Sequence, residues 1–316
     1  MEIKGLALSR AYYEEFGRPM LEKDFPELMP FIAAGLAGAG SECFGYDDEI
    51  SRDHDFEPGF AIFLPGEDIV DRRTAFRLER AYAALPREFM GFSRSMIQPV
   101  GGARHGVIRT AEFFMEKTGT VGGDLSVSQW LTVPSQSLAE AAEGEIFTDN
   151  YGEITSIRKR ISFYPEDIRR KKLAAHLLLM AQSGQYNYQR CLLHGESGAA
   201  QMAVFHFVKS TMEAVFLLNR VYQPYYKWSF RRMRSLPELS LLAELLEYLI
   251  TSDNDGENAE EKYNVIEGIA ADVIDVLMEQ DLTKAVCGDL EKHAYSVNDS
   301  IADGALRNMH ILAGIS

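Results

Sequence analysis

Apolar positions in the first half of the chain come in short runs separated by turns. The small, apolar segment 31–40 and the apolar run 59–65 are typical of buried strands on either side of a turn. Between 68 and 85 apolar residues recur at near-helical spacing, and 105–110 predicts a further strand leading into a helix. This half therefore predicts a domain of strands and helices. Short helices are also predicted at 5–22, 24–29, 126–131 and 137–143.

The second half of the chain is dominated by helical patterning. Pro165 lies where a helix begins, a position at which proline is tolerated. Predicted helices span 165–183, 196–222, 239–250 and 259–280. The pattern divides the chain into residues 1–152 and residues 153–316, the second being a helical bundle. The expected fold class is α+β.

Gly40-Ser41 and Asp53-His54-Asp55 form the motif with the clearest chemistry. In a strand, residues two apart project to the same face, so Asp53 and Asp55 are expected side by side. Two adjacent carboxylates repel unless a cation lies between them, and Mg²⁺ prefers oxygen ligands together with substrate phosphates. Gly40 would let the backbone approach a triphosphate, and Ser41 would donate to a phosphate oxygen. Arg52 would add positive charge near the phosphates.

A plainer interpretation of this stretch is an acidic, solvated turn. Acidic loops are common in a chain with a net charge of −15. The Gly-Ser pair upstream, and the apolar segments on either side, favour the metal and triphosphate interpretation.

On these residues the chain resembles the polymerase-beta-like nucleotidyltransferase superfamily. More closely, it is similar to a bacterial family of nucleotidyltransferase-like proteins known mainly as a domain of unknown function. Three further blocks carry that closer resemblance: 144–149 with Arg158 and Tyr164-Pro165, then 195–200, and then 222–228.

The resemblance implies a mixed-sheet catalytic domain with flanking helices, followed by a helical domain, as in kanamycin nucleotidyltransferase. It implies transfer of a nucleoside monophosphate, AMP from ATP or the equivalent from another triphosphate, to a hydroxyl of an unidentified small-molecule acceptor. Mg²⁺, or Mn²⁺ in its place, would be bound by Asp53 and Asp55. By analogy with the kanamycin enzyme, Glu196 is the candidate general base.

The chain departs from the superfamily pattern at two points. Between the aspartates stands His54, where the superfamily usually has an apolar residue. Active members also carry a third carboxylate on a later strand, and the strand expected at 105–110 contains no acid. Glu112 is the candidate for that role, and Asp124 lies further along. Because the strand expected at 105–110 lacks the third carboxylate, a catalytically degenerate nucleotide sensor is an alternative function. Protein adenylylation is a further alternative.

Lys227 lies among Tyr225, Tyr226 and Trp228, and three arginines follow within seven residues. Aromatic rings beside cations can stack on a base and contact phosphates, so Lys227 is a candidate nucleotide contact. The alternative is a corner between helices with a snorkelling lysine.

Composition narrows the class of protein further. No run of about 18 apolar residues is present, and the first residues lack the pattern of a signal peptide, so neither a membrane partner nor export is expected. Three scattered cysteines favour a cytoplasmic protein without disulfides. The acidic charge argues against nucleic-acid binding and suits a small cationic acceptor.

Overall fold

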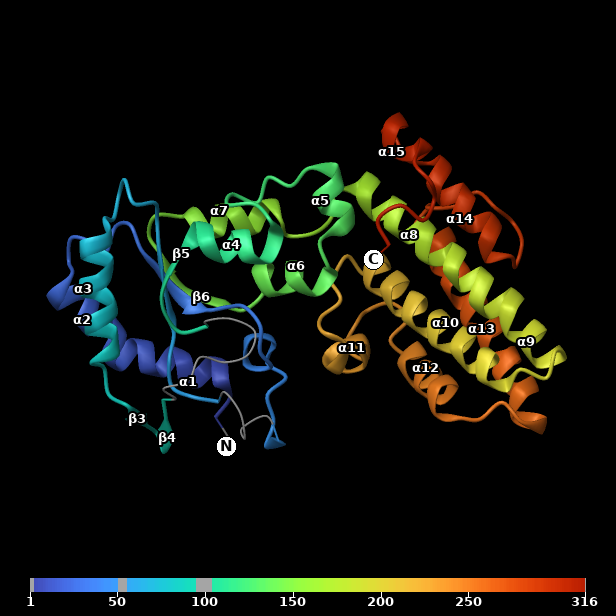
Figure 1. Ribbon diagram of the computed structural model, residues 1–316, viewed down its shortest axis with the longest axis horizontal. Coiled ribbons are helices and arrows are strands. Elements are labelled where there is room, and N and C mark those ends of the chain that lie inside the picture. The colour runs from blue at the N-terminus through green and yellow to red at the C-terminus, as the bar shows by residue number, and fades with distance from the viewer. Residues whose placement is uncertain (1–2, 51–55, 95–103, 316) are drawn as a thin grey trace. The chain divides into compact units, whose positions relative to one another are not determined.

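The computed structural model describes residues 3–50, 56–94 and 104–315 (Figure 1). Contacts divide the chain into two compact units. The first comprises Met1–Leu125 and Ser137–Ser162, and the second comprises Ser126–Gln136 and Phe163–Ser316. The fold is α+β, as expected: a small mixed sheet with helices in the first unit, and helices in the second.

The sheet of the first unit has the strand order β5-β2-β1-β6. Its strands are β1 (Ala33–Leu36), β2 (Ala61–Leu64), β5 (Gly106–Arg109) and β6 (Glu145–Asp149). β1 is antiparallel to both β2 and β6, whereas β2 and β5 are parallel. The register of β1 against β6 shifts between Ala34 and Gly35, an irregularity of the kind often found next to functional sites. A separate two-stranded antiparallel sheet consists of β3 (Glu88–Phe89) and β4 (Phe92–Ser93).

Helices cover both faces of the sheet, which explains why β1 and β2 are apolar along their whole length. On one face, side chains of Ala34, Ile62 and Leu64 join a core with α1 (Gly5–Tyr12), η1 (Tyr13–Gly17), α2 (Arg18–Asp24) and α3 (Arg72–Ala83). On the other, Phe63 meets Phe113 of α4 (Thr110–Thr118) edge to face, with ring centroids 5.4 Å apart. The unit is completed by η2 (Glu42–Phe44), by α6 (Ser135–Ala142) from Ser137 onward, and by α7 (Glu153–Arg160).

Local signals explain several boundaries in this unit. Asp71 caps α3 by accepting a hydrogen bond of 2.7 Å from the Thr74 N–H. Gly119, in a left-handed conformation, ends α4. The helix predicted at 24–29 is wrong: α2 ends at Asp24 and turns follow, because Pro26 and Pro30 disfavour helical backbone before them. β6 is a strand that the sequence pattern does not predict.

The second unit is a bundle built around α8 (Glu166–Met180) and α10 (Ser197–Leu218), which run alongside each other (Figure 1). α8 continues without a break through the π-helix η4 (Ala181–Tyr188) into α9 (Gln189–Leu193), beyond the end predicted at 183. Gly184 lies inside this continuous helix, and its missing side chain makes room for the Phe207 ring. The remaining helices are α5 (Val127–Thr132), α11 (Tyr226–Met233), α12 (Leu242–Thr251), α13 (Gly256–Glu279), α14 (Leu290–Asp299) and α15 (Gly304–Asn308).

Of the helices in the described residues, none has both the length and the apolarity needed to cross a membrane.

Candidate functional site

One end of the sheet gathers four chain segments. The segments are the turn after β1 and the stretches of chain that enter β2, β5 and β6. Their position follows from the strand pairing, in which Gly35 lies opposite Ala61, Ala61 opposite Gly106, and Leu36 opposite Glu145. This end of the sheet, called the motif edge below, therefore brings Gly40-Ser41 near the chain that follows the Asp53/Asp55 motif.

The turn at Gly40-Ser41 follows β1 directly. Gly40 has φ +134, a conformation that favours glycine. Ser41 is the N-cap of η2, and its carbonyl accepts a hydrogen bond of 2.8 Å from the Tyr46 N–H. The sequence thus bends here into a tight, glycine-dependent loop. Its role in holding a triphosphate stays a prediction.

A buried ion pair lies against this turn. Arg104, two residues before β5, donates from Nη1 to Glu42 Oε1 over 2.5 Å, and the two side chains are 6% and 9% exposed. A Cβ added at Gly40 would collide with the Arg104 guanidinium and stand 2.7 Å from Glu42 Oε1. The absence of a side chain at Gly40 therefore makes room for the pair, which puts a fixed positive group beside the turn. Sequence reasoning missed both members.

A second pair joins the entries of β2 and β5. His105 Nδ1 lies 2.9 Å from Glu57 Oε1, and both side chains are nearly buried. In the sequence Glu57 continues the alternation of Asp53 and Asp55, two residues apart each time. That alternation was a signal by which Glu57 could have been found. It adds a carboxylate to the motif edge.

The candidates for a third carboxylate do not lie at the motif edge. Glu112 is exposed in the first turn of α4, which follows the far end of β5. Asp124 is exposed and lies 3.6 Å from Arg160 Nε. The strand topology therefore favours Glu57 over Glu112 as an additional acid beside the motif.

Arg52, Asp53 and Asp55 lie outside the described residues. Within residues 3–50, 56–94 and 104–315 no three His, Cys, Asp or Glu side chains are grouped so as to hold a metal ion. The metal role of Asp53 and Asp55 accordingly remains a prediction.

Arg158, one of the residues that carried the family resemblance, has a structural position. Its guanidinium donates to the carbonyls of Ala141 (3.1 Å), Gly144 (3.3 Å) and Glu143 at the end of α6. Burial lowers the pKa of this group, and the nearby Cys43 opposes that effect. Arg158 thus satisfies helix-end carbonyls just before β6. Cys43 itself is buried, and burial raises the pKa of its thiol, as expected of an apolar filler.

Two further candidates belong to the second unit. Glu196 is the exposed N-cap of α10, and its side chain makes no capping hydrogen bond. Lys227, exposed in the first turn of α11, holds Nζ 5.1 Å from the centre of the Trp228 ring, and Arg231 lies 5.9 Å from the same ring. Tyr226 beside them is 73% exposed. Aromatic and cationic side chains are therefore exposed together on α11, while the nucleotide-contact role of Lys227 and the base role of Glu196 stay predictions.

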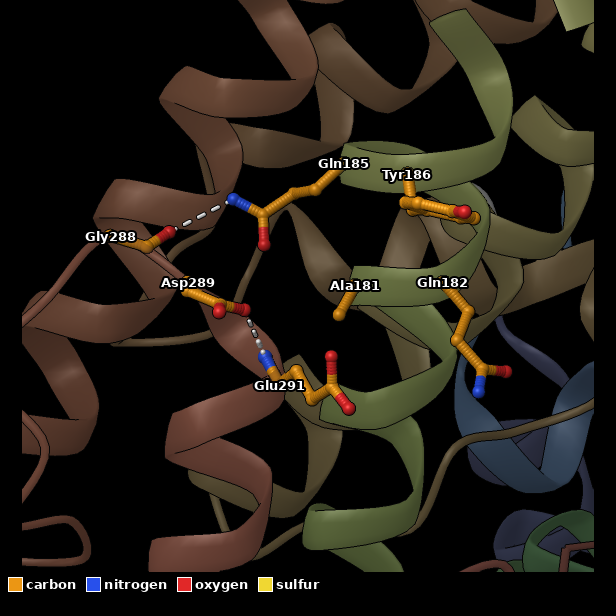
Figure 2. Close-up of a pocket in the computed structure, with 7 residues that line it drawn as sticks. All are labelled: Ala181, Gln182, Gln185, Tyr186, Gly288, Asp289 and Glu291. Atoms are coloured by element: carbon orange, nitrogen blue, oxygen red, sulfur yellow. Dashed lines mark hydrogen bonds between the residues drawn. The ribbon is translucent and has the colours of Figure 1, made fainter. Parts of the chain in front are cut away.

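The second unit also contains a hollow of about 510 Å³ between η4 and the start of α14 (Figure 2). Two of its polar side chains, those of Gln185 and Asp289, make hydrogen bonds that serve the fold. Gln185 donates from Nε2 to the Gly288 carbonyl and to Glu267 Oε2, each over 2.9 Å, and accepts from the Leu290 N–H over 3.0 Å. Asp289 accepts from the Glu291 N–H over 2.9 Å. These hydrogen bonds hold η4 against α13 and the start of α14, and the hollow lies beside that contact.

Comparison with known proteins gives a partial match. The family model described as "Domain of unknown function (DUF4037)" matches residues 130–229, from within α5 into α11 and fewer than half of the 316 residues. No curated protein matches the chain. Among solved structures, the nucleotidyltransferase-like protein from Exiguobacterium sibiricum 255-15 aligns with a TM-score of 0.35 and 11% identity, over 85% of this chain and 76% of that chain. This is a distant likeness.

Proposed function

We propose that the protein is a nucleotidyltransferase, which transfers a nucleoside monophosphate, AMP from ATP, to a hydroxyl of a small-molecule acceptor. The acceptor oxygen attacks the α-phosphorus and forms the new P–O bond. The bond between the α-phosphorus and the bridging oxygen breaks, pyrophosphate leaves, and the acceptor proton passes to a base.

The observation that supports this proposal best is the built turn at the motif edge. A triphosphate needs backbone that can approach closely and a fixed positive charge nearby. Gly40-Ser41 offers the first, since Gly40 lacks a side chain at a position with positive φ. Arg104, fixed by Glu42, offers the second. The chain enters β2 at this same edge, directly after Asp53-His54-Asp55.

Asp53 and Asp55 are the proposed ligands of Mg²⁺, or of Mn²⁺ in its place. Glu57 brings another oxygen donor to the edge, and oxygen donors are what these hard cations prefer. When bound, the ion would stabilise negative charge on the phosphates. Glu196 is the proposed base, and Lys227 a proposed contact to the nucleotide. The net charge of −15 favours a cationic acceptor.

The test is pyrophosphate release from ATP, GTP, CTP and UTP with Mg²⁺ and a panel of hydroxylated amines as acceptors. Asp53→Asn is expected to abolish release and to leave the far-ultraviolet circular dichroism unchanged. Asp124→Asn, which alters an exposed aspartate away from the motif edge, serves as the control and should retain activity. Equal release by the wild type and Asp53→Asn would refute the mechanism.

A nucleotide sensor is the second candidate, and a specific observation favours it. β5 carries no acid, and Glu42 and Glu57 at the motif edge are already paired with Arg104 and His105. Calorimetry with ATP and Mg²⁺ distinguishes the two functions. Binding without release of pyrophosphate across the acceptor panel, and without labelling of lysate proteins by ATP carrying label on its α-phosphate, would favour the sensor.

A further inference from the structure

A cavity of about 320 Å³ lies within the second unit, between α8 and α10. Lys172, His176 and Leu179 recur on one face of α8, and His206, Lys209/Ser210 and Glu213 recur on one face of α10. Residues 133–135 and 314–315 complete the wall. Two polar helix faces therefore line this space, where an ordinary bundle would bury apolar side chains.

His176 is a buried polar group in the wall of the cavity. Its side chain is 9% exposed, and Nδ1 has no hydrogen-bond partner in the part of the chain that the structure describes. Burial, with smaller effects from Lys172 and Lys209, lowers the pKa of the imidazole to about 3, so the ring is neutral at pH 7. A buried polar group without a partner destabilises a fold by about 1–3 kcal/mol. Such a group is typical of a place where a ligand supplies the missing hydrogen bond.

Glu213 presents a carboxylate to the same cavity. It is partly buried, and neither a hydrogen bond nor an ion pair joins it to another described residue. Burial raises its pKa, and the positive charges of Lys172 and Lys209 oppose that effect only in part. Its oxygens are therefore acceptors that await donors.

Lys172 supplies positive charge on the opposite side. Its Nζ donates to the Leu131 carbonyl (2.9 Å) and the Gly314 carbonyl (3.2 Å) and lies 5.3 Å from the Tyr164 ring centre. Two of its three protons are thus used. Lys209 is exposed. Lys172 and Lys209 thus bring two ammonium groups to a cavity whose lining contains one carboxylate, that of Glu213.

We propose that this cavity binds a small carboxylate that also carries a hydroxyl or amino group, as hydroxy acids and amino acids do. The ligand carboxylate would lie with Lys172 and Lys209, the two lysines that line the cavity. The hydroxyl or amino group would donate to Glu213 and complete the hydrogen bonding of His176. Because the cavity lies wholly within the second unit, this proposal does not depend on nucleotidyl transfer at the motif edge.

The test measures thermal shift and calorimetric binding of the full chain with the twenty amino acids, glycolate, lactate, glycerate and malate. Sulfate and glucose are the chemical controls, because sulfate is an anion without a hydrogen-bond donor and glucose has donors without the anion. At least one carboxylate is expected to bind and to raise the melting temperature in a concentration-dependent way.

Two variants and two matched controls locate the binding. Glu213→Gln and Lys209→Gln should each weaken binding by about tenfold or more, because each removes a charged hydrogen-bond partner. Glu244→Gln and Lys159→Gln make the same changes at exposed positions outside the cavity and should not alter affinity. The proposal is overturned if no carboxylate binds at millimolar concentration, if only sulfate or glucose binds, or if both cavity variants bind as the wild type does.

Discussion

Buried polar and charged groups are arranged differently in the two units. At the motif edge, Arg104 pairs with Glu42 and His105 with Glu57, each pair joining chain segments far apart in sequence. In the cavity between α8 and α10, His176 and Glu213 have no such partners among the described residues. At the motif edge the protein's own side chains pair with one another, whereas in the cavity the hydrogen bonding of these groups is incomplete.

The contrast teaches what each place is suited for. Paired groups that are shielded from water hold a fixed geometry, which suits the positioning of a substrate on a turn. Buried polar groups without partners destabilise the folded chain, and a ligand that supplies those partners can remove this destabilisation. The following experiments test this contrast, from the largest expected effect to the smallest.

Arg104→Met should lower the free energy of unfolding by about 3–5 kcal/mol, because it removes a buried positive partner of the Glu42 carboxylate. Urea unfolding measures the loss. Adding Glu42→Gln to this variant should recover part of it. Arg72→Met, in the exposed pair with Glu67, is the matched control and should change stability little. Equal losses at Arg104 and Arg72 would show that the motif-edge pair is not desolvated.

His176→Leu should flatten the dependence of stability on pH. The pKa of His176 is about 3 in the folded chain, against an ordinary value of 6.5 for histidine, so between these values the unfolded chain binds a proton that the folded chain does not. Wild-type stability therefore falls as pH drops below 6.5, by about 1.4 kcal/mol per unit, and this contribution is absent from the variant. Between pH 6.5 and 4.5 the two proteins should diverge by roughly 2–3 kcal/mol.

The groups facing His176 are Lys172 on α8 and His206, Lys209 and Glu213 on α10, and all are present in both proteins. Urea unfolding at a series of pH values gives the two profiles. The control is the exposed His194, since His194→Leu should leave the wild-type profile unchanged. Parallel profiles for the wild type and His176→Leu would mean that the ring protonates in the folded state.

Gly40→Ala should cost about 1–3 kcal/mol of stability and weaken ATP binding, since φ +134 is unfavourable for alanine and the new Cβ would displace Arg104. Gly91→Ala is the matched control. Gly91 also has a positive φ, +84, but a Cβ there meets nothing within 4 Å. The difference between the two variants in urea unfolding measures the collision, and no difference would mean that Arg104 moves aside freely.

Glu213→Gln should stabilise the ligand-free chain by about 0.5–1 kcal/mol at pH 7. A folded-state pKa above the unfolded value means that the ionised carboxylate disfavours folding, and the amide removes that charge. Thermal unfolding measures the gain, with the exposed Glu244→Gln as reference. A loss of stability in Glu213→Gln would indicate that the lysines stabilise this carboxylate after all.

The sequence is most informative where the signal is local. Apolar runs predict β1, β2 and β5, and helical spacing predicts α3, α8, α10 and α13, because burial on one or both faces imposes those patterns. The glycine-dependent turn at Gly40 is predicted from a dipeptide. The helix predicted at 24–29 neglects the prolines at 26 and 30. The helix end predicted at 183 is wrong, because the helix continues through Gly184. The glycine at this position makes room for the Phe207 ring.

The candidate site is predictable only in part. Gly40, Ser41 and the aspartates stand close together in sequence. Arg104 lies 62 residues from Glu42, and the two meet only because β5 pairs in parallel with β2. No local pattern predicts that pairing. The polar residues of the site, Arg104 and His105, also lie just before β5, whereas the sequence analysis expected an acidic residue within that strand. The cavity likewise depends on two helices whose facing sides no local pattern specifies.

The position of β1 in the sheet has a consequence for biosynthesis. β1 hydrogen-bonds to β2 on one side and to β6 on the other, and β6 is translated long after β2. Until residue 149 has left the ribosome, one edge of β1 has no partner strand, and an open strand edge invites pairing with another chain. Nascent chains stalled before this point are expected to need protection by chaperones, while those stalled beyond α7 carry the complete sheet and the Arg158 contacts that secure its last strand.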